Sequence, residues 1–464
     1  MKILISNSLD NHALSCEYNK GSEAVAIATI KMLRQAWPDA EIASFVQFTD
    51  SFTEANGIRV IESKRFTTTR FSPGTLLESS LNLVRCKLWA ALHKHCPRAA
   101  KAIINNKRLR EYTNADIVLD LGLDTYSDDY GMLAVIEHSK DILLGLLLRR
   151  PVVIWAQSLG PFQSKLTKWL VKFALNRVAL ITAREEISLE QLRLLGINGP
   201  PIHLTADPAF LLEPASEKTV REMLSMEGIR TDGKPLVGLT LSWSSVIGKS
   251  KKSRFLQIAK EVFWIMRALL PERLFQFLLR MSGRYKRLDM ASYIDNKVIA
   301  EIADYLVERL DAYVLLVPHD YNPAADDRKL LKEILKAVKH NERVKLLARE
   351  YSAPQLKGFI GQCDMFVGGK MHANIAALSM CVPTVGIQYG SKFYGIMRML
   401  GQEQYVCDKL TFHEVRAKID EAWSNREGIR AELKTKLVTV KKQALQNCEL
   451  VKQLVEHRQL SNTS

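Results

Sequence analysis

The 464-residue chain has few cysteines, and their spacing is irregular. There are seven, an odd number, and no two of them form a Cys-x-x-Cys pair. A disulfide framework or a cysteine-ligated zinc site needs paired or regularly spaced cysteines. No group of His, Asp and Glu has the spacing of a metal site either. We therefore expect reduced thiols, no metal ion and no cofactor.

Long uninterrupted hydrophobic runs are also missing. The apolar stretch at residues 262–279 (VFWIMRALLPERLFQFLL) is broken by Arg267, Pro271, Glu272 and Arg273, which excludes a membrane span there. The opening residues MKILISNS enter a strand pattern at once, without the apolar core of a secretory signal. We therefore expect a cytoplasmic protein.

Acidic residues are the minority among the charged ones, with 50 Asp and Glu against 65 Lys and Arg, a net charge of +15. Such an excess favours nucleic acid, an anionic membrane surface or anionic substrates as partners. No zinc-finger spacing, aromatic RNA-binding strand or basic recognition helix is present. Nucleic acid is therefore excluded as the expected partner.

Two segments concentrate the positive charge, residues 85–110 and 249–287. Both mix Lys and Arg with Trp, Phe and Leu at helical spacing, which is typical of helices in a lipid headgroup interface. An ordinary amphipathic helix with a solvated basic face has the same composition. Peripheral contact with the inner face of an anionic membrane and a plain covering helix therefore both stay open.

Short apolar strands alternate with helical segments along most of the chain, which predicts doubly wound parallel sheets. We expect a first Rossmann-like domain at residues 1–214 and a second at 235–410. The basic segment 249–287 is predicted to be an insertion in the second domain, before a helix at about Asn296 to Leu310. Residues 411–464 are predicted to form helices that fold back across the boundary.

Residues 364–395, DMFVGGKMHANIAALSMCVPTVGIQYGSKFYG, predict a strand, a tight turn, a helix and a second strand. His372 lies at the start of the predicted helix, two residues after Lys370 and three after Gly369. The free N–H groups at a helix start form an anion site, which Lys370 and Lys392 would reinforce. A histidine that only bonds a neighbouring strand is the alternative for His372.

This block closely resembles the signature of the polysaccharide pyruvyl transferase family, in the patches KMHA (370–373) and YGSK (389–392). Further patches follow in the family's order, and they are NKGSEA (19–24), ADIVLDLGLD (115–124), QSLGP (157–161), AREE (183–186) and ADPAF (206–210). Departures are Ser22 in place of an acidic residue, a glycine run reduced to Gly122, and Lys370 in place of arginine. The first two place the acceptor's identity in question more than the type of reaction.

The resemblance implies two Rossmann-like domains that face a cleft, similar to the GT-B architecture, and phosphoenolpyruvate as donor. In the family, the equivalents of Arg184, His372 and Lys392 bear on that donor, and Lys370 would add charge. The alternative for Arg184 is a salt bridge to a neighbouring glutamate.

Ligands of open parallel sheets bind beyond the carboxyl ends of the strands. Asp124, His319 and Asp320 follow such ends and are candidate acceptor or cleft residues; for the last two, a loop cap at the strand end is the alternative. Asp207 is interpreted as a turn or cap residue. The general base is left open among Asp124, Asp320 and their neighbours.

Three functions remain compatible with the sequence. The first is transfer of a pyruvyl group from phosphoenolpyruvate to a hydroxyl of a cell-surface or lipid-linked glycan, forming a ketal, with His372 as general acid. The second is a GT-B glycosyltransferase that uses a nucleotide sugar, because fold alone does not fix function. The third is a catalytically silent member that binds glycans or membranes.

Overall fold

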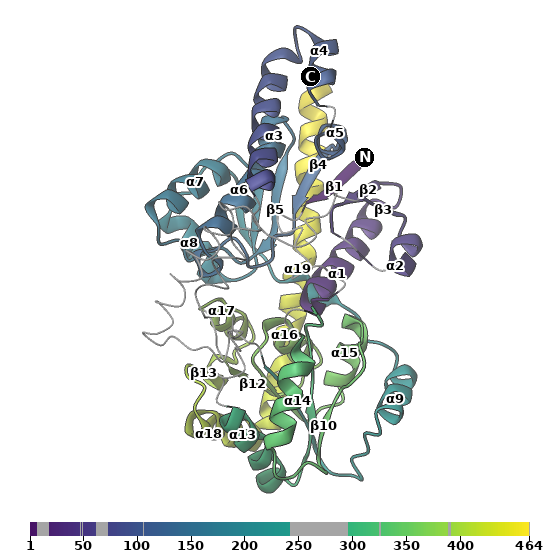
Figure 1. Ribbon diagram of the computed structural model, residues 1–464. Helices are drawn as coiled ribbons and strands as arrows, with labels where there is room; N and C mark the ends of the chain where they lie inside the picture. The colour runs from purple at the N-terminus through teal and green to yellow at the C-terminus, as the bar shows by residue number, and fades with distance from the viewer. Residues whose placement is uncertain are drawn as a thin grey trace, which may run out of the picture.

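The computed structural model describes residues 1–6, 18–46, 48, 50–61, 73–104, 106–241, 296–323, 326–387 and 391–463. Two α/β bodies lie one above the other, and the C-terminal helix runs through both (Figure 1). The predicted insertion at 249–287 and the motif residues Tyr389 and Gly390 lie outside the described residues. The structure therefore does not test those predictions.

The first body is built on a seven-stranded sheet of order β3-β2-β1-β4-β5-β6-β7, in which all pairs are parallel. Its strands are β1 (Lys2–Ser6), β2 (Glu41–Ser44), β3 (Ile58–Val60), β4 (Ile117–Asp120), β5 (Val152–Gln157), β6 (Leu180–Ala183) and β7 (Ile202–Leu204). The intervening helices are α1 (Lys20–Ala36), α2 (Asp50–Ala55), α3 (Pro73–Leu92), α4 (Pro97–Ile103), α5 (Lys107–Asn114), α6 (Met132–Leu147), α7 (Lys165–Leu175) and α8 (Glu186–Leu194), with 3-10 turns η1 (Asp128–Tyr130) and η2 (Pro208–Leu211).

The second body is built on a six-stranded parallel sheet of order β10-β9-β8-β11-β12-β13. Its strands are β8 (Leu236–Thr240), β9 (Tyr313–Leu316), β10 (Val344–Leu346), β11 (Met365–Gly368), β12 (Thr384–Ile387) and β13 (Val406–Cys407). The described helices that follow η2 in the chain are α9 (Glu217–Met226), α13 (Asn296–Leu310), α14 (Asp327–Ala337), α15 (Ala353–Ile360), α16 (Met371–Ser379), α17 (Ser391–Met399), α18 (Phe412–Ser424) and α19 (Arg426–Thr463), with the 3-10 turn η4 (Glu403–Tyr405).

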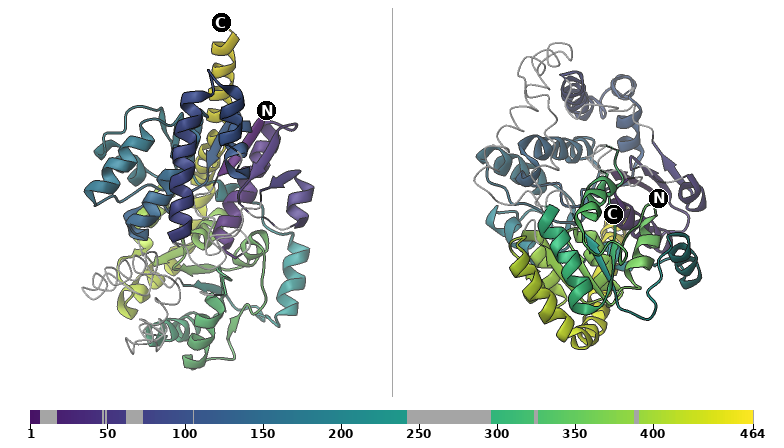
Figure 2. Two further views of the ribbon diagram at one scale, coloured as in Figure 1. Left: turned by 45° about the horizontal axis from the view of Figure 1, so that its top comes forward. Right: turned by 60° about the horizontal axis from the view of Figure 1, so that its bottom comes forward.

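Alternate side chains of the central strands enter opposite cores, as the twofold repeat of a strand requires. In β1, Leu4 contributes to the core beneath α3, α5, α6 and α7, whereas Ile3 and Ile5 contribute to the core beneath α1 and α19. Since both faces are covered, β4 and β5 are buried along their whole length. Figure 2 shows these helix layers from two further directions.

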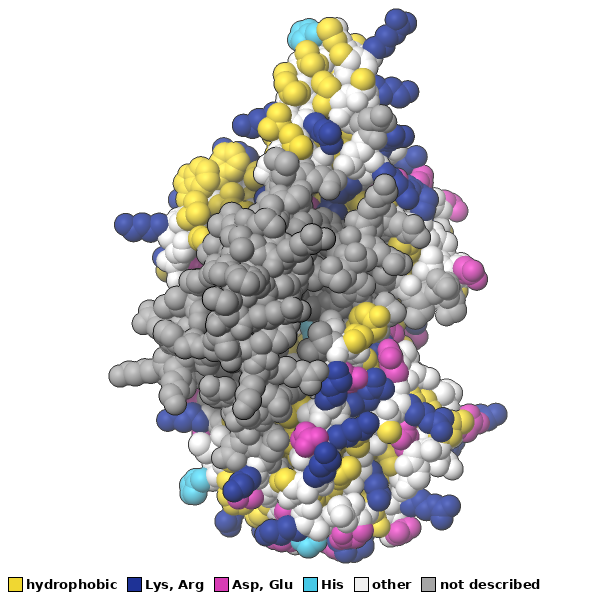
Figure 3. Space-filling model, viewed as in Figure 1, with side chains coloured by type: hydrophobic (Ala, Val, Ile, Leu, Met, Phe, Trp, Pro, Cys, Tyr) yellow, Lys and Arg dark blue, Asp and Glu magenta, His cyan; other side chains and the backbone are white. Residues whose placement is uncertain are grey.

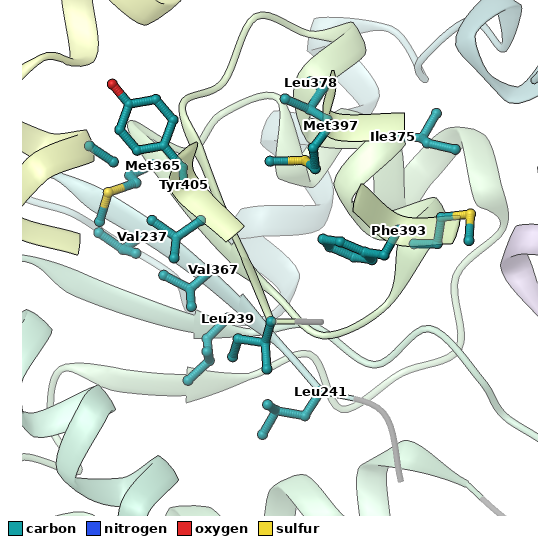
Figure 4. Close-up of a cluster of buried hydrophobic side chains, with 14 of the residues drawn as sticks. Val237, Leu239, Leu241, Met365, Val367, Ile375, Leu378, Phe393, Met397 and Tyr405 are labelled. Atoms are coloured by element: carbon teal, nitrogen blue, oxygen red, sulfur yellow. The ribbon is translucent and has the colours of Figure 1, made fainter. Parts of the chain in front are cut away.

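The core of the second body is assembled in the same way. Val237, Leu239, Met365 and Val367, from the neighbouring strands β8 and β11, project toward Ile375, Leu378, Phe393, Met397 and Tyr405 (Figure 4). These side chains are buried. The packing fixes the base of α16, the helix that carries His372.

The last helix joins the two bodies. Ile429 and Leu433 of α19 lie in the core of the second body, whereas Cys448 and Val451 lie in that of the first. Asn447, fully buried in α19, donates to the carbonyl of Ala206 at 3.0 Å and accepts from the Thr205 hydroxyl. The expected fold class, α/β with two parallel sheets, is confirmed.

Several predicted boundaries were confirmed and others shifted. The helix at Asn296–Leu310 was predicted correctly. The first helix begins at Lys20, where the Asn19 side chain caps the N–H groups of Gly21 and Ser22. The basic segment 85–110 is divided among α3, α4 and α5, with Pro97 opening a new helix.

No helix within the described ranges is both long enough and apolar enough to cross a membrane.

Candidate active site

His372 occupies the place that the sequence predicted, at the second residue of α16. Strand β11 ends at Gly368, and α16 begins at Met371 with Lys370 as its N-cap residue. Lys370 makes no side-chain capping bond. A Cβ atom on Gly368 would overlap the Asn374 amide, whose nitrogen donates to the Gly368 carbonyl. The turn therefore needs glycine and brings the helix start close to the strand end.

Lys370 is held by a buried carboxylate. Its Nζ lies 2.7 Å from Oδ2 of Asp327, and that same oxygen accepts the backbone N–H groups of His319 and Asp320, each at 2.8 Å. Burial raises the pKa of Asp327, whereas Lys370 opposes the shift. Asp327 thus ties the loop after β9 to the start of α16.

The start of α1, from the first body, meets the start of α16. A Cβ atom on Gly21 would lie 2.4 Å from Nδ1 of His372, so the α1 backbone lies directly against the imidazole. The Lys20 N–H donates to the His319 carbonyl at 3.1 Å, and Asn19 Nδ2 lies 3.4 Å from Oδ2 of Asp320. Two helix N-termini, each with a positive dipole end, therefore converge beside His372.

On its other side, His372 faces a fully buried ion pair. Arg184 Nη1 and Asp207 Oδ2 are 2.5 Å apart, and neither side chain is exposed. His372 Nε2 lies 3.4 Å from the same Asp207 oxygen. That separation is long for a hydrogen bond, and Nε2 is buried without a formed one in the described part of the chain. The imidazole is thus held near an anion while retaining hydrogen-bonding capacity.

Asp207 stays ionised despite its burial. Desolvation opposes the charge, but Arg184 and His372 outweigh it and lower the pKa of the carboxyl to about 2. Asp207 also caps η2 through the Ala209 N–H at 2.8 Å. The predicted capping role is confirmed, and the contacts with Arg184 and His372 are additional. The sequence carried no signal for them, because Asp207 and His372 lie on different bodies.

Arg184 is placed differently from an open-cleft residue. Its Nε donates to the Ser158 hydroxyl at 2.7 Å, and that hydroxyl donates to Glu185 at 2.8 Å. Its Nη2 lies 3.5 Å from the sulfur of Met371, the first residue of α16. Arg184 therefore reaches the start of α16 from the first body as a buried charge, and its ion-pair partner is Asp207 rather than the neighbouring glutamate of the alternative interpretation.

His319 and Asp320 lie at the same junction. Burial, with Lys370, His372 and Lys20 nearby, keeps the pKa of His319 well below its usual range, so this imidazole is neutral at neutral pH. Burial also raises the pKa of Asp320. The two side chains thus supply a neutral hydrogen-bonding group and a carboxyl group that protonates more readily than usual.

The other predicted site residues stand as follows. Asp124 is half-buried after β4, accepts from the Tyr130 hydroxyl at 2.7 Å, and contributes its charge to the environment of Arg184. Lys392 lies in the first turn of α17, and its side chain is outside the described residues. The described residues contain no group of three or more His, Cys, Asp or Glu that could hold a metal ion.

One buried pair near the end of β4 had no signal in the sequence. His138 Nε2 and Asp120 Oδ2 are 2.6 Å apart, and both side chains are buried. A Cβ atom on Gly122 would lie 2.0 Å from the His138 ring, and Gln157 Nε2 donates to the Asp120 carbonyl at 2.7 Å. The pair supports the loop that carries Asp124, and it explains why glycine stands at 122.

Known proteins resemble this chain along most of its length. The model of the family described as polysaccharide pyruvyl transferase matches residues 19–391, from the cap of α1 to the first residue of α17. The chain belongs to the polysaccharide pyruvyl transferase family. The amylovoran biosynthesis protein AmsJ of Erwinia amylovora is 24% identical over 443 residues, covering 93% of this chain and 94% of AmsJ.

Solved structures support the fold. HepE of Anabaena, in complex with UDP and glucose, has a TM-score of 0.55 at 12% identity, covering 98% of this chain and 99% of HepE. A glycosyltransferase of Rickettsia africae has a TM-score of 0.54 at 12% identity, covering 98% of each chain. MnaA of S. aureus, bound to UDP, has a TM-score of 0.53 at 12% identity, covering 93% of this chain and 90% of MnaA. The expected GT-B-like architecture is thus confirmed; at this identity the likeness concerns the fold alone.

Proposed function

We propose that this family member transfers a pyruvyl group from phosphoenolpyruvate to a sugar hydroxyl and closes a pyruvate ketal on a cell-surface or lipid-linked glycan. One observation carries the proposal. His372, with a buried Nε2 that has no formed hydrogen bond within the described ranges, lies where two helix N-termini, Lys370 and Arg184 converge. That combination suits an anionic substrate that must be protonated.

The chemistry requires a proton on the methylene carbon of phosphoenolpyruvate. His372 donates it, which leaves an oxocarbenium-like centre at the neighbouring carbon. An acceptor hydroxyl attacks that centre and loses its proton to a base. The bond to phosphate then breaks, which forms a second oxocarbenium-like centre. A second hydroxyl of the same sugar attacks that centre, closes the ketal ring and gives its proton to the departing phosphate. The products are the ketal and inorganic phosphate.

The charges around His372 fit a donor that carries a carboxylate and a phosphate. Lys370 supplies a cation at the start of α16, and the N–H groups of that helix supply partial positive charge. Arg184 adds a buried charge beside the start of this helix. Lys392, at the start of α17, is the third cation proposed for the donor. A point charge at 370 binds an anion with less directional constraint than the family's usual arginine.

The first body is proposed as the acceptor side.

Asp320, in the loop after β9 of the second body, is the preferred general base, because burial raises its pKa and a carboxylate of higher pKa takes a proton more readily. Asp124 is the second candidate, held by Tyr130. Neutral His319 would donate or accept a hydrogen bond without adding charge. We propose that the reaction takes place at the cytoplasmic face of the membrane.

The experiment is a phosphate-release assay with phosphoenolpyruvate and lipid-linked sugar extracts. The proposal predicts phosphate release that depends on both substrates, and ketal formation detected by mass spectrometry. Thermal stabilisation by a UDP-sugar, with no response to phosphoenolpyruvate, would instead favour the glycosyltransferase that the architecture also allows. Glycan binding without turnover of either donor would favour a silent family member.

A further inference from the structure

Helix α7 exposes a stripe of large apolar side chains. Leu166, Trp169 and Phe173 are 49%, 62% and 38% exposed, and their spacing places them on one face of the helix. Trp169 stacks on Phe173, with ring centroids 5.9 Å apart, and the Arg177 guanidinium lies over the Phe173 ring at 3.9 Å. The stripe is thus continuous, ordered and open to solvent.

Helix α3 repeats the pattern. Leu81, Val84 and Leu88 are 45%, 53% and 49% exposed, with the same spacing as the α7 stripe. Helix α6 contacts both α3 and α7, so the three helices form one layer over the first sheet. In Figure 3, hydrophobic side chains gather at the top of the molecule and at its upper left, where Figure 1 places α3 and α7.

The exposed charge along both stripes is mostly positive. Residues 79–110 and 142–184 contain no Asp or Glu. The exposed cations beside the α7 stripe are Lys165, Lys168, Lys172 and Arg177, and those beside the α3 stripe and on α4 are Arg85, Lys87, Lys94, Arg98 and Lys101. In Figure 3, Lys and Arg side chains project around each hydrophobic group. A surface of large apolar side chains bordered mainly by cations is rare on a protein that contacts water alone.

We propose that these exposed faces of α3 and α7, with the basic residues of α4, form a docking surface for a membrane that carries anionic lipid headgroups. Trp169, Phe173 and the leucines enter the interface, while the long Lys and Arg side chains reach the headgroups. Charge complementarity selects this occupant, because exposed cations border both apolar stripes, while the nearby carboxylates Asp128 and Glu137 are engaged with Thr167 and Lys140. Trp at such a boundary adds a ring that is apolar with a polar edge.

This inference extends the sequence prediction for residues 85–110 and adds α7, which composition alone did not single out. It is independent of the reaction assigned to the site, because none of these helices supplies a residue to the His372 junction. It does explain how an enzyme acting on a lipid-linked glycan would stay near its acceptor.

Vesicle co-sedimentation tests the proposal with the full-length protein. We expect binding to vesicles containing phosphatidylglycerol, little binding to neutral phosphatidylcholine vesicles, and loss of binding as salt rises, since charges are screened beyond about 10 Å at 0.1 M salt. Trp169→Glu and Val84→Glu should each lower the partition coefficient about tenfold or more, because an apolar side chain that would enter the membrane interface is replaced by an anion. Replacing Lys165, Lys168 and Lys172 by glutamine should lower it about fivefold per lysine.

The matched control is Val438→Glu, a change of the same kind at a side chain that is 72% exposed on α19. It should leave vesicle binding unchanged. Wild-type protein that stays in the supernatant with anionic vesicles at low salt would overturn the proposal. So would unchanged binding in the Trp169 and Val84 variants, which would assign the membrane contact to another surface.

Two further measurements distinguish the membrane proposal from a protein–protein interface and from the proposed reaction. A dimer in analytical ultracentrifugation that Trp169→Glu dissociates, with no vesicle binding by the wild type, would identify the stripe as a protein interface and overturn the membrane assignment. Phosphate release on a water-soluble acceptor should be the same in Trp169→Glu and wild type. Absence of phosphate release in both, with vesicle binding intact, would count against the proposed reaction and leave the docking surface standing.

Discussion

The backbone of Gly21 lies directly against the imidazole of His372, so that a methyl group at position 21 would stand 2.4 Å from Nδ1 and 2.9 Å from Cβ. Gly21 belongs to α1 of the first body, whereas His372 belongs to α16 of the second. The contact places the proposed general acid at the boundary of the two bodies, where the position of α1 governs the position of the imidazole.

Gly21→Ala should therefore lower turnover while the fold is retained. Alanine is favoured over glycine within a helix by roughly 0.5–1 kcal/mol, so the backbone itself does not oppose the change. The clash displaces the imidazole, and a misplacement of about 1 Å in an active site costs on the order of 10²-fold in rate. Steady-state kinetics with circular dichroism checks this; normal turnover would show that the contact does not position His372.

Asp207→Asn should destabilise the protein. It leaves the buried Arg184 charge without its anion, and breaking a buried pair costs roughly 3–5 kcal/mol. Denaturant unfolding measures the loss, and Arg184→Met combined with Asp207→Leu should recover much of it. An unchanged free energy of unfolding in Asp207→Asn would show that the ion pair does not stabilise the folded protein.

The same pair gives a signed pH dependence. The folded pKa of Asp207, about 2, is below the 3.8 of an ordinary aspartate, so its stabilisation is complete above 3.8 and is lost as pH falls toward 2. Wild type should thus lose more stability than Asp207→Asn between pH 4 and pH 2.

The sequence could predict the alternation of strands and helices and the position of His372 at a helix start. These depend on local periodicity and on turn residues such as Gly368 and Gly369. It could not predict which distant side chains meet. Asp207 was interpreted as a cap, and His138 had no apparent partner, because their contacts with His372 and Asp120 depend on how elements pack in space. Arg184 was identified from its motif, but its complete burial was not predicted.

Lys357 should make stability rise with pH above neutrality. Its Nζ is buried between α15 and the chain after η2 and donates to the Leu212 carbonyl at 2.5 Å. Burial, reinforced by Lys441, lowers its pKa from 10.5 to about 7. Between these values the unfolded chain binds more protons than the folded one, so stability rises with pH across that window.

Lys357→Met should remove that slope. Melting temperatures at pH 7, 8 and 9 check the prediction: wild type should gain stability over this range, and the variant should gain clearly less. Since pH affects every titratable group, the comparison between the two proteins is the informative quantity. Parallel curves would show that Lys357 does not titrate in this range.

Lys370→Ala should weaken binding of phosphoenolpyruvate, because it removes a cation facing an anion and leaves Asp327 buried without its partner. A charge-assisted bond of this kind contributes roughly 1.5–3 kcal/mol. Lys370→Arg, which restores the family's usual residue, should be tolerated. Calorimetric titration of the donor into each variant measures the effect, and equal affinity in wild type and Lys370→Ala would place the donor elsewhere.

The central claim is that His372 delivers the proton to phosphoenolpyruvate. The most direct test is phosphoenolpyruvate-dependent phosphate release with a sugar acceptor, measured for wild type and for folded His372→Ala. The account predicts release by the wild type and a loss of roughly 10²–10⁴-fold in the variant, the range of general acid catalysis. Near-normal release by the folded variant would contradict it.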